Sequence, residues 1–292
     1  VRIDRSTYRI KLSDAVIAEG EVQAGKILAL DWGGARGDLP GRPTTDPALG
    51  LPAVWIDPGL KEQAERQGYT LTDAAGVLAT HLTQVIRRHS DELLSREATK
   101  HLLESLKRTA PAVVEELIPN QLKLGDVQRV LQLLLREGVP IRNLAGILET
   151  LGDHAGRTKQ PEELVEAVRA RLGRTLCARY RDPSKRLYVV TLDPHWEDRI
   201  AAATTATGAR AALAPSTIEE ICRLTTVEVE KLEAMGRPAI IVVGPRVRSS
   251  FKQLTSSRLP DLVVLSYAEI TPDTRLDALG MVRDATAVAR AG

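Results

Sequence analysis

Aromatic residues are scarce in this sequence. Phe, Trp and Tyr make up 3% of its 292 residues, and only one of them is Phe. Proteins that bind single-stranded nucleic acid stack bases on such rings, and nucleic-acid-binding domains in general carry an excess of basic charge. The formal net charge here is only +2. We therefore expect no nucleic-acid partner and a core built from Leu, Val, Ile and Ala.

Cysteines and long apolar runs are also few. Cys177 and Cys222 lie far apart and belong to no metal or redox motif, so we interpret them as reduced, buried thiols in a cytosolic setting. The longest apolar runs, such as residues 239–243, are a handful of residues, whereas a membrane helix needs about 20. The sequence begins at Val1, so we interpret it as a fragment whose longer chain could hold a membrane segment upstream.

A phosphate-binding loop of the usual form is missing as well. Residues 33–50 are rich in Gly and Pro, but no Gly-Lys-Ser/Thr follows them and no helix is predicted to begin there. We interpret this stretch as a connector. The sequence predicts no cofactor and no metal site.

The strongest periodic pattern lies in the middle of the chain, in residues 114–151. Two segments there repeat the i, i+3, i+4, i+7 spacing of one helix face, and Gly138 and Pro140 separate them. The pattern predicts a helical hairpin whose apolar faces pack into a core. The apolar positions are Val127, Val130, Leu131 and Leu134 in the first helix, and Leu144, Ile147, Leu148 and Leu151 in the second.

The N-terminal third alternates in the manner of β-strands. Residues 8–12, 15–22 and 26–32 predict three strands of a meander. A small α/β unit is expected over residues 51–90, and a further helix over residues 97–108. The α/β unit would hold strands at 53–57 and 69–72 and helices at 61–67 and 73–90, with Asp73 as the N-cap of the second helix.

The C-terminal part predicts a second α/β unit after one long helix at residues 161–180. Two apolar runs joined by a helical segment favour a parallel strand pair with a right-handed crossover. Ser216 and Glu219 form the pattern of a capping box, and the last twenty residues are expected to lack regular structure. The expected elements are strands at 187–192, 239–243 and 262–265 and helices at 194–203, 216–235 and 246–257.

Asp193 and His195 are the best local candidates for catalysis. They follow the strand predicted at residues 187–192, and α/β enzymes place catalytic groups at strand ends. The five histidines are scattered, and no partner for His195 can be named from the sequence. An α/β enzyme with a site near Asp193 and His195 is therefore the alternative to a binding or assembly module.

A collinear series of motifs runs through the sequence: DPALGLPAVWI at 46–56, GYT at 68–70, ATHL at 79–82, GVPIRNL at 138–144, ILETL at 147–151, PEEL at 161–164 and LGR at 172–174. In this order the motifs resemble the FlhA/InvA/LcrD family of type III export-gate proteins. Two further C-terminal runs fit the same family: LSYAEI at 265–270, and TLDP at 191–194, which favours the flagellar branch over the injectisome branch.

The resemblance implies an α+β fold of several subdomains, with an N-terminal β-meander, an inserted α/β unit, an all-helical centre and a C-terminal α/β unit. It implies a non-enzymatic docking platform on the cytoplasmic face of the bacterial inner membrane, tethered by an N-terminal membrane half. Implied partners are export chaperone–substrate complexes, the export switch protein, the ATPase complex and copies of itself in a nonameric ring. The expected subdomains are 1–46 with 94–113, 47–93, 114–183 and 184–292.

The resemblance also implies a hydrophobic chaperone-binding dimple between the first two subdomains. Tyr69 stands where many relatives have Phe and keeps an aromatic ring with a polar tip. Arg66 stands at a position that is acidic in some relatives, and Leu49 replaces a common Phe. Carried over by motif position, the binding residues are Pro52, Ile56, Arg66, Tyr69, Leu93, Ala98 and Thr99.

Overall fold

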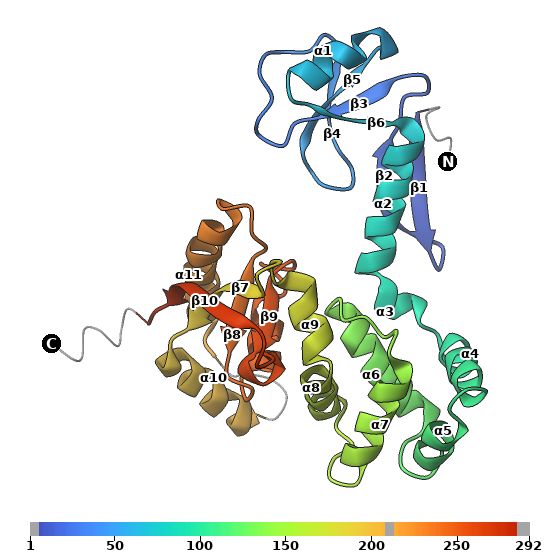
Figure 1. Cartoon of the computed structure of the whole chain (residues 1–292), viewed down its shortest axis with the longest axis vertical. Helices are drawn as coiled ribbons and strands as arrows, with labels where there is room; N and C mark the ends of the chain where they lie inside the picture. Colours follow the sequence, from blue (N-terminus) through green and yellow to red (C-terminus); the bar gives the residue numbers. More distant parts are fainter. Residues whose placement is uncertain (1–5, 208–212, 285–292) are drawn as a thin grey trace, which may run out of the picture. The chain divides into compact units, whose positions relative to one another are not determined.

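The computed structural model describes residues 6–207 and 213–284. The chain divides into two compact units (Figure 1). The first unit is Val1–Ser95 with Leu135–Gly138, and the second is Arg96–Leu134 with Val139–Gly292. Both contain helices and strands, which confirms the predicted mixed fold class.

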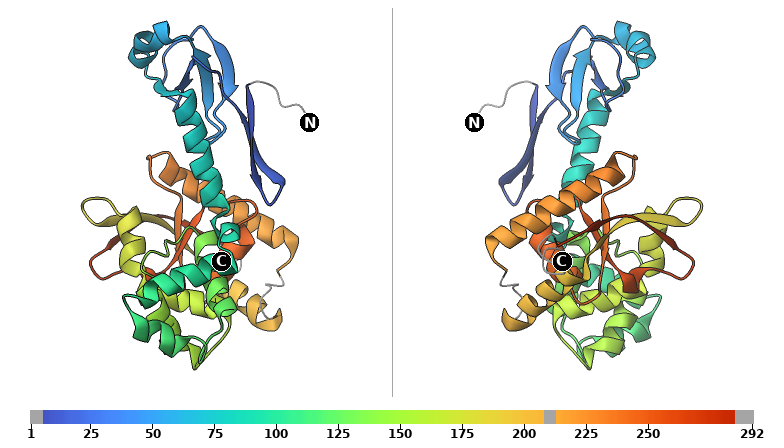
Figure 2. Two further views of the ribbon diagram at one scale, coloured as in Figure 1. Left: turned by 90° about the vertical axis from the view of Figure 1, so that its right-hand side faces the viewer. Right: turned by 90° about the vertical axis from the view of Figure 1, so that its left-hand side faces the viewer.

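The first unit begins with a β-hairpin. Strands β1 (Thr7–Leu12) and β2 (Ala15–Glu21) pair antiparallel around a turn at Ser13 and Asp14, both of which have positive φ. Such a two-residue turn matches the right-handed twist of the strands. The hairpin lies beside helix α2 (Ala74–Arg88) (Figure 2). The Tyr8 hydroxyl of β1 forms a hydrogen bond of 2.6 Å with Nδ1 of His81, a residue of α2.

The predicted three-stranded meander is wrong. Strand β3 (Ile27–Leu30) does not pair with β2 but lies inside a separate antiparallel sheet of order β4-β5-β3-β6. Its last three residues are all buried, and a strand buried on both faces needs a partner along each edge. Those partners are β5 (Pro52–Ile56) and β6 (Thr70–Asp73).

Strand β4 (Arg42–Thr45) lies where a connector was predicted. Its sequence, RPTT, is polar and lacks apolar alternation, and Pro43 is tolerated because β4 is an edge strand. The sheet joins β3 and β4 to β5 and β6, so the predicted boundary at residues 46/47 does not coincide with a break in the sheet.

Short helices complete the first unit. Helices α1 (Lys61–Arg66) and α2 follow β5 and β6, and Asp73 Oδ1 accepts the Gly76 N–H at 2.7 Å, which confirms the predicted N-cap of α2. The remaining short elements are η1 (Pro58–Leu60) and α3 (Ser90–Leu93).

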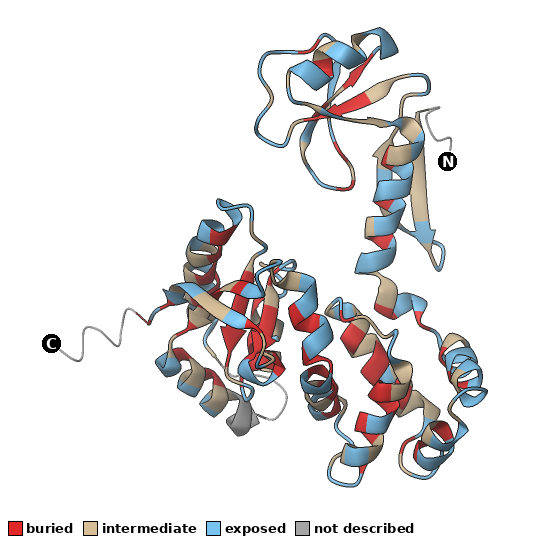
Figure 3. Cartoon of the chain, in the orientation of Figure 1, coloured by how far each residue is buried: buried red, intermediate tan, exposed pale blue. Residues whose placement is uncertain are grey.

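The helical part of the second unit contains the predicted hairpin. The predicted apolar residues of α6 (Leu124–Arg136) are fully buried, and so are those of α7 (Leu144–Ala155) except Leu144, which is partly buried; Figure 3 shows the buried residues in red. The predicted helix at 161–180 is instead two helices, because the chain bends at Leu172 before Gly173, which lies against the Glu269 backbone where no side chain would fit. The other helices are α4 (Arg96–Lys107), α5 (Pro111–Leu117), α8 (Pro161–Arg171) and α9 (Gly173–Tyr180).

The C-terminal part is a parallel sheet of order β10-β7-β8-β9. The predicted parallel pair is confirmed as β8 (Ile240–Val243) and β9 (Val263–Ser266), joined through α12 (Arg248–Thr255). Helices α10 (Pro194–Thr207) and α11 (Pro215–Glu233) follow β7 (Arg186–Leu192).

Two predictions for this part are wrong. The last twenty residues contain strand β10 (Arg275–Val282), which gains regular structure by pairing with β7, a partner about ninety positions earlier in the sequence. The capping box is not formed, because α11 begins at Pro215 with Ala214 as its N-cap and no side-chain cap bond. Pro is favoured in the first turn, where its missing N–H costs nothing.

One buried and one partly buried ion pair join the helical part to the C-terminal part. Arg169 on α8 is 2% exposed, and its Nε and Nη2 donate to the two carboxylate oxygens of Glu269, each at 3.0 Å. Arg248, also fully buried, is paired with Glu166 of α8. The paired residues are 100 positions apart in the first pair and 82 in the second, and the two parts that they connect belong to one compact unit.

Candidate docking site

The first unit contains a cavity of about 370 Å³ beside its sheet. Two of the predicted binding residues, Pro52 and Tyr69, line it together. Apolar groups form most of the wall, and two carboxylates stand among them. The lining residues are Asp31, Asp38, Leu39, Pro43, Thr44, Pro52, Ala53, Val54 and Tyr69.

Tyr69 is held by contacts on several sides. Its N–H donates to Ala64 O at 3.0 Å, and its hydroxyl donates to Gly37 O at 3.1 Å. Its ring packs against a buried cluster that includes Leu39 and Ile56. The ring is therefore fixed in place while part of it stays exposed to the cavity, as a preformed anchor for a partner requires.

Asp31 shapes the loop on one side of the cavity. Its N–H donates to Pro52 O at 3.0 Å, and its Oδ1 accepts the N–H groups of Gly33 at 2.7 Å and Ala35 at 3.1 Å. The hydrogen bonds from Ala35 and then Gly33 lower the pKa of Asp31 below its ordinary value. This carboxylate is therefore charged at neutral pH and fixed next to Pro52.

The charge of the cavity is negative. Asp38 is exposed, and among the described residues neither Asp31 nor Asp38 forms an ion pair. An apolar wall with two carboxylates accepts an aliphatic or aromatic side chain that has a cation beside it. The geometry thus suits a protein partner with a Lys or Arg next to an apolar residue.

The other predicted binding residues do not line this cavity. Ile56 is fully buried and supports Tyr69 from within. Arg66 is exposed on α1, where its Nε donates to Glu62 O at 3.2 Å, and Leu93 is exposed at the end of α3. The last two, Ala98 and Thr99, belong to the second unit on α4, and Thr99 is fully buried there.

Sequence reasoning missed most of the lining. Asp38, Leu39 and Pro43 lie in the Gly- and Pro-rich stretch that was interpreted as a connector. The available signals were two aspartates, Asp31 just before this stretch and Asp38 within it, and Trp32 in a sequence with few aromatic residues. Trp32 directly follows Asp31 and is 63% exposed, which is unusual for the largest side chain.

Asp193 and His195, the residues of the alternative catalytic site, both form contacts at the start of α10. Asp193 Oδ1 accepts the His195 N–H at 2.9 Å at the start of α10. His195 Nε2 lies 3.8 Å from Asp284 Oδ2, and Arg199 Nη1 holds the same buried carboxylate at 2.8 Å. In the part of the chain that the structure describes, no group of three or more His, Cys, Asp or Glu side chains could hold a metal ion.

Comparison with known proteins agrees with this fold. The FHIPEP family model matches residues 1–275. The flagellar biosynthesis protein FlhA of Bacillus subtilis is 37% identical over 284 residues, covering 97% of this chain, and FlhA of Escherichia coli is 36% identical over 269 residues, covering 92%. The chain spans only 42% and 38% of the length of these relatives.

Solved structures are similar over nearly the whole chain. The Chlamydia pneumoniae CdsV protein has a TM-score of 0.86 and 25% identity, over 96% of this chain and 82% of its own. A nonameric EPEC SctV-C structure has a TM-score of 0.76 and 21% identity, over 96% and 85%, and shows the shared fold alone. No helix within residues 6–207 and 213–284 is both long and apolar enough to cross a membrane. The chain therefore belongs to the FHIPEP family, as its motifs predicted, and has the fold of the CdsV and SctV-C structures.

Proposed function

We propose that this chain is a docking platform of a type III protein export gate, which binds export chaperone–substrate complexes through the cavity at Pro52 and Tyr69. The cavity is the observation that carries the proposal. It unites two residues predicted from the family motifs with an apolar wall, a fixed aromatic ring and two carboxylates. These are features of a protein-binding hot spot rather than of a catalytic centre.

A flagellar rather than an injectisome system is favoured by the degree of similarity. Identity to the FlhA proteins of Bacillus subtilis and Caulobacter vibrioides is 37%, against 25% for CdsV. Because the chain spans about two fifths of such relatives, we place it within a longer protein whose remainder would hold it at the cytoplasmic face of the inner membrane.

Ring assembly and contact with the rest of the export apparatus are part of the same proposal. The support is the shared fold with the nonameric SctV-C and with the CdsV of the CdsV and CdsO complex, which is 26% identical with a TM-score of 0.85. The export switch protein and the ATPase complex are the further partners proposed. We propose no catalytic residue, because Asp193 caps the start of α10 and the exposed side chain of His195 lies beside the carboxylate of Asp284, which Arg199 holds.

Calorimetry with a cognate flagellar chaperone–substrate complex tests the docking role. Tyr69→Ala should weaken binding by on the order of 2 kcal/mol, because it removes the ring that forms part of the cavity wall. Tyr267→Ala is the matched control, since it removes an exposed tyrosine of the second unit and should leave the affinity unchanged. Equal affinity of the Tyr69→Ala protein and the wild type, with the fold intact by circular dichroism, would refute the proposal.

A further inference from the structure

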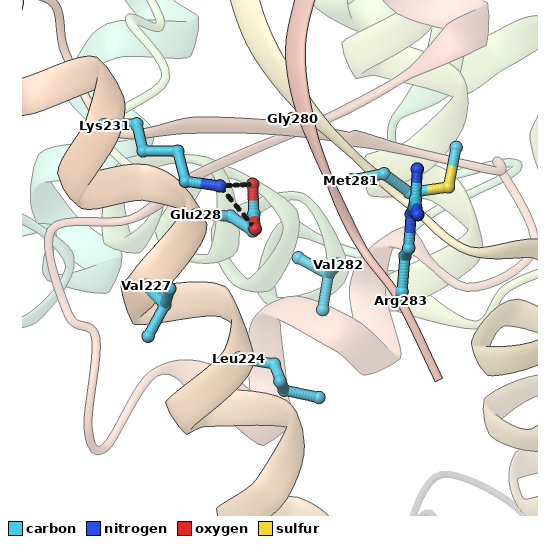
Figure 4. A pocket seen from close by; sticks show the side chains of 8 residues that line it. All are labelled: Leu224, Val227, Glu228, Lys231, Gly280, Met281, Val282 and Arg283. Carbon is cyan, nitrogen blue, oxygen red and sulfur yellow. Dashed lines mark hydrogen bonds and ion pairs between the residues drawn. The ribbon is translucent and has the colours of Figure 1, made fainter. Parts of the chain in front are cut away.

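A second cavity lies in the second unit, between α11 and the edge strand β10 (Figure 4). Its volume is about 670 Å³, and all of its lining residues belong to the second unit. Leu224 and Val227 of α11 form one wall, and strand β10 forms the other, with the side chain of Met281 on the face of the strand away from α11 (Figure 4). The buried side chain of Val282 lies between the two walls, so the groove has an apolar floor.

Strand β10 is available for pairing along this groove. It pairs with β7 on one edge, and among the described residues its other edge has no strand beside it. Edge strands are usually protected by charged residues, Pro or strong bulges. The second half of β10, residues 278–282, has no charge and no Pro, only a register shift between Ala278 and Gly280.

The apolar groups along the groove are unusually exposed. Val227 is 47% exposed and Met281 39% exposed, and Leu279 on β10 also belongs to the exposed large hydrophobic residues. A free strand edge next to an apolar helix face is the arrangement by which some domains bind a peptide as an added strand. The main chain then supplies affinity, and alternate side chains supply specificity.

The charges at the groove select the kind of peptide. Glu228 is neutralised by Lys231, whose Nζ lies 2.7 Å from each carboxylate oxygen (Figure 4). Glu228 also lies against the Gly280 backbone, where a larger residue would collide with it. Arg283 directly follows β10, is exposed and has no ion pair within the described residues, so the face of the strand away from α11 has one unmatched positive charge beside the groove (Figure 4).

We propose that this groove binds an extended segment of a partner protein as an added strand on β10. The segment has apolar residues at alternate positions, directed toward Val227 on the α11 side of β10, and an acidic residue at an intervening position that faces Arg283 on the other side. The site lies entirely in the second unit and is independent of the proposed docking of chaperones in the first.

The probe is a fluorescent peptide of about eight residues. Valine and threonine alternate along it, and two glutamates stand at one end. Versions with the glutamates at the N-terminal or the C-terminal end allow for either strand direction. Anisotropy should show saturable binding of one version. N-methylation of alternate amides should abolish it by removing main-chain donors, and replacement of the glutamates by lysines should weaken it about tenfold.

Matched variants locate the site. Val227→Asp should weaken binding of the peptide at least about tenfold. Met235→Asp, just beyond α11 and outside the groove, places the same charge at another exposed apolar residue and should leave binding unchanged. Arg283→Glu should reverse the preference between the glutamate and lysine peptides.

Three results would overturn the proposal. These are no saturable binding of any version, equal binding of the N-methylated peptide, and equal effects of Val227→Asp and Met235→Asp. Self-association of the chain that is abolished by Val227→Asp in light scattering would instead identify a second copy as the occupant.

Discussion

Buried carboxylates have two different uses in this protein, which Asp46 of the first unit and Glu269 of the second unit illustrate. In the first unit, buried Asp46 accepts the N–H groups of Ala48 at 3.0 Å and Leu49 at 2.7 Å, so that it shapes a local turn, as Asp31 does beside the cavity. In the second unit, buried Glu269 pairs with Arg169, one hundred positions away. The first pattern fixes a local turn, and the second, which Asp91 of the first unit also forms with Arg136, fastens elements that are far apart in the sequence.

The cavity of the first unit and the buried ion pair of the second should respond differently to substitution. The cavity of the first unit depends on loop conformation, which short-range hydrogen bonds set at little cost in desolvation. The second unit depends on pairs whose charges are out of water, where removal of one partner leaves the other uncompensated. Substitutions should therefore affect mainly binding in the first unit and mainly stability in the second.

The largest expected effect is on the buried pair. Glu269→Ala should lower the free energy of unfolding by about 3–5 kcal/mol, because Arg169 would remain buried without its partner. Urea titration followed by circular dichroism measures the change. Glu219→Ala is the matched control, since its partner Arg258 is exposed and the loss should be below about 1 kcal/mol. Similar losses for the two variants would contradict the distinction between buried and exposed pairs.

The helical hairpin should be nearly as sensitive. Leu134 is fully buried on α6, so Leu134→Ala should lower the free energy of unfolding by about 2–5 kcal/mol through lost burial and a residual cavity. Leu102→Ala on α4, where the leucine is exposed, provides the comparison and should cost less than about 1 kcal/mol. Normal thermal unfolding of the Leu134→Ala protein would show that the hairpin is not a scaffold.

A smaller effect is expected at the edge of the cavity in the first unit. Asp38→Lys reverses an exposed charge and should weaken binding of a chaperone–substrate complex by about 0.5–1 kcal/mol, mainly through slower association at low salt. Stopped-flow or surface plasmon resonance measurements at two salt concentrations test this. Asp261→Lys, an exposed aspartate of the second unit, should have no effect, and a salt-independent result for Asp38→Lys would exclude an electrostatic role.

The smallest effect concerns pH. Burial, and then the charge of Asp46, raises the pKa of Tyr8 from 10.0 to about 12. The folded state therefore holds the phenol proton more tightly than the unfolded chain does. This contribution is complete below pH about 10 and is lost as the pH rises toward about 12. Tyr8→Phe should flatten the decline of the thermal midpoint in that range, and an unchanged slope would contradict the assignment.

Periodic patterns predicted the local elements well. The faces of α6 and α7, the Asp73 N-cap and the buried strands β8 and β9 follow from residues within one or two turns or one short run. For the cavity, the family motifs supplied Pro52 and Tyr69, which the structure places together. Elements that depend on a distant partner were missed, such as β4 with its polar sequence and β10 in a tail of small residues.

The sequence by itself determined the family, the mixed fold class and the aliphatic core, because motif order, periodicity and composition are properties of the chain alone. Only the tertiary structure decided which strands pair, that Asp31 and Asp38 stand beside Tyr69, and that Arg169 meets Glu269. These contacts join residues tens of positions apart. Their free energy exists only when the chain is folded, so no local pattern reveals them.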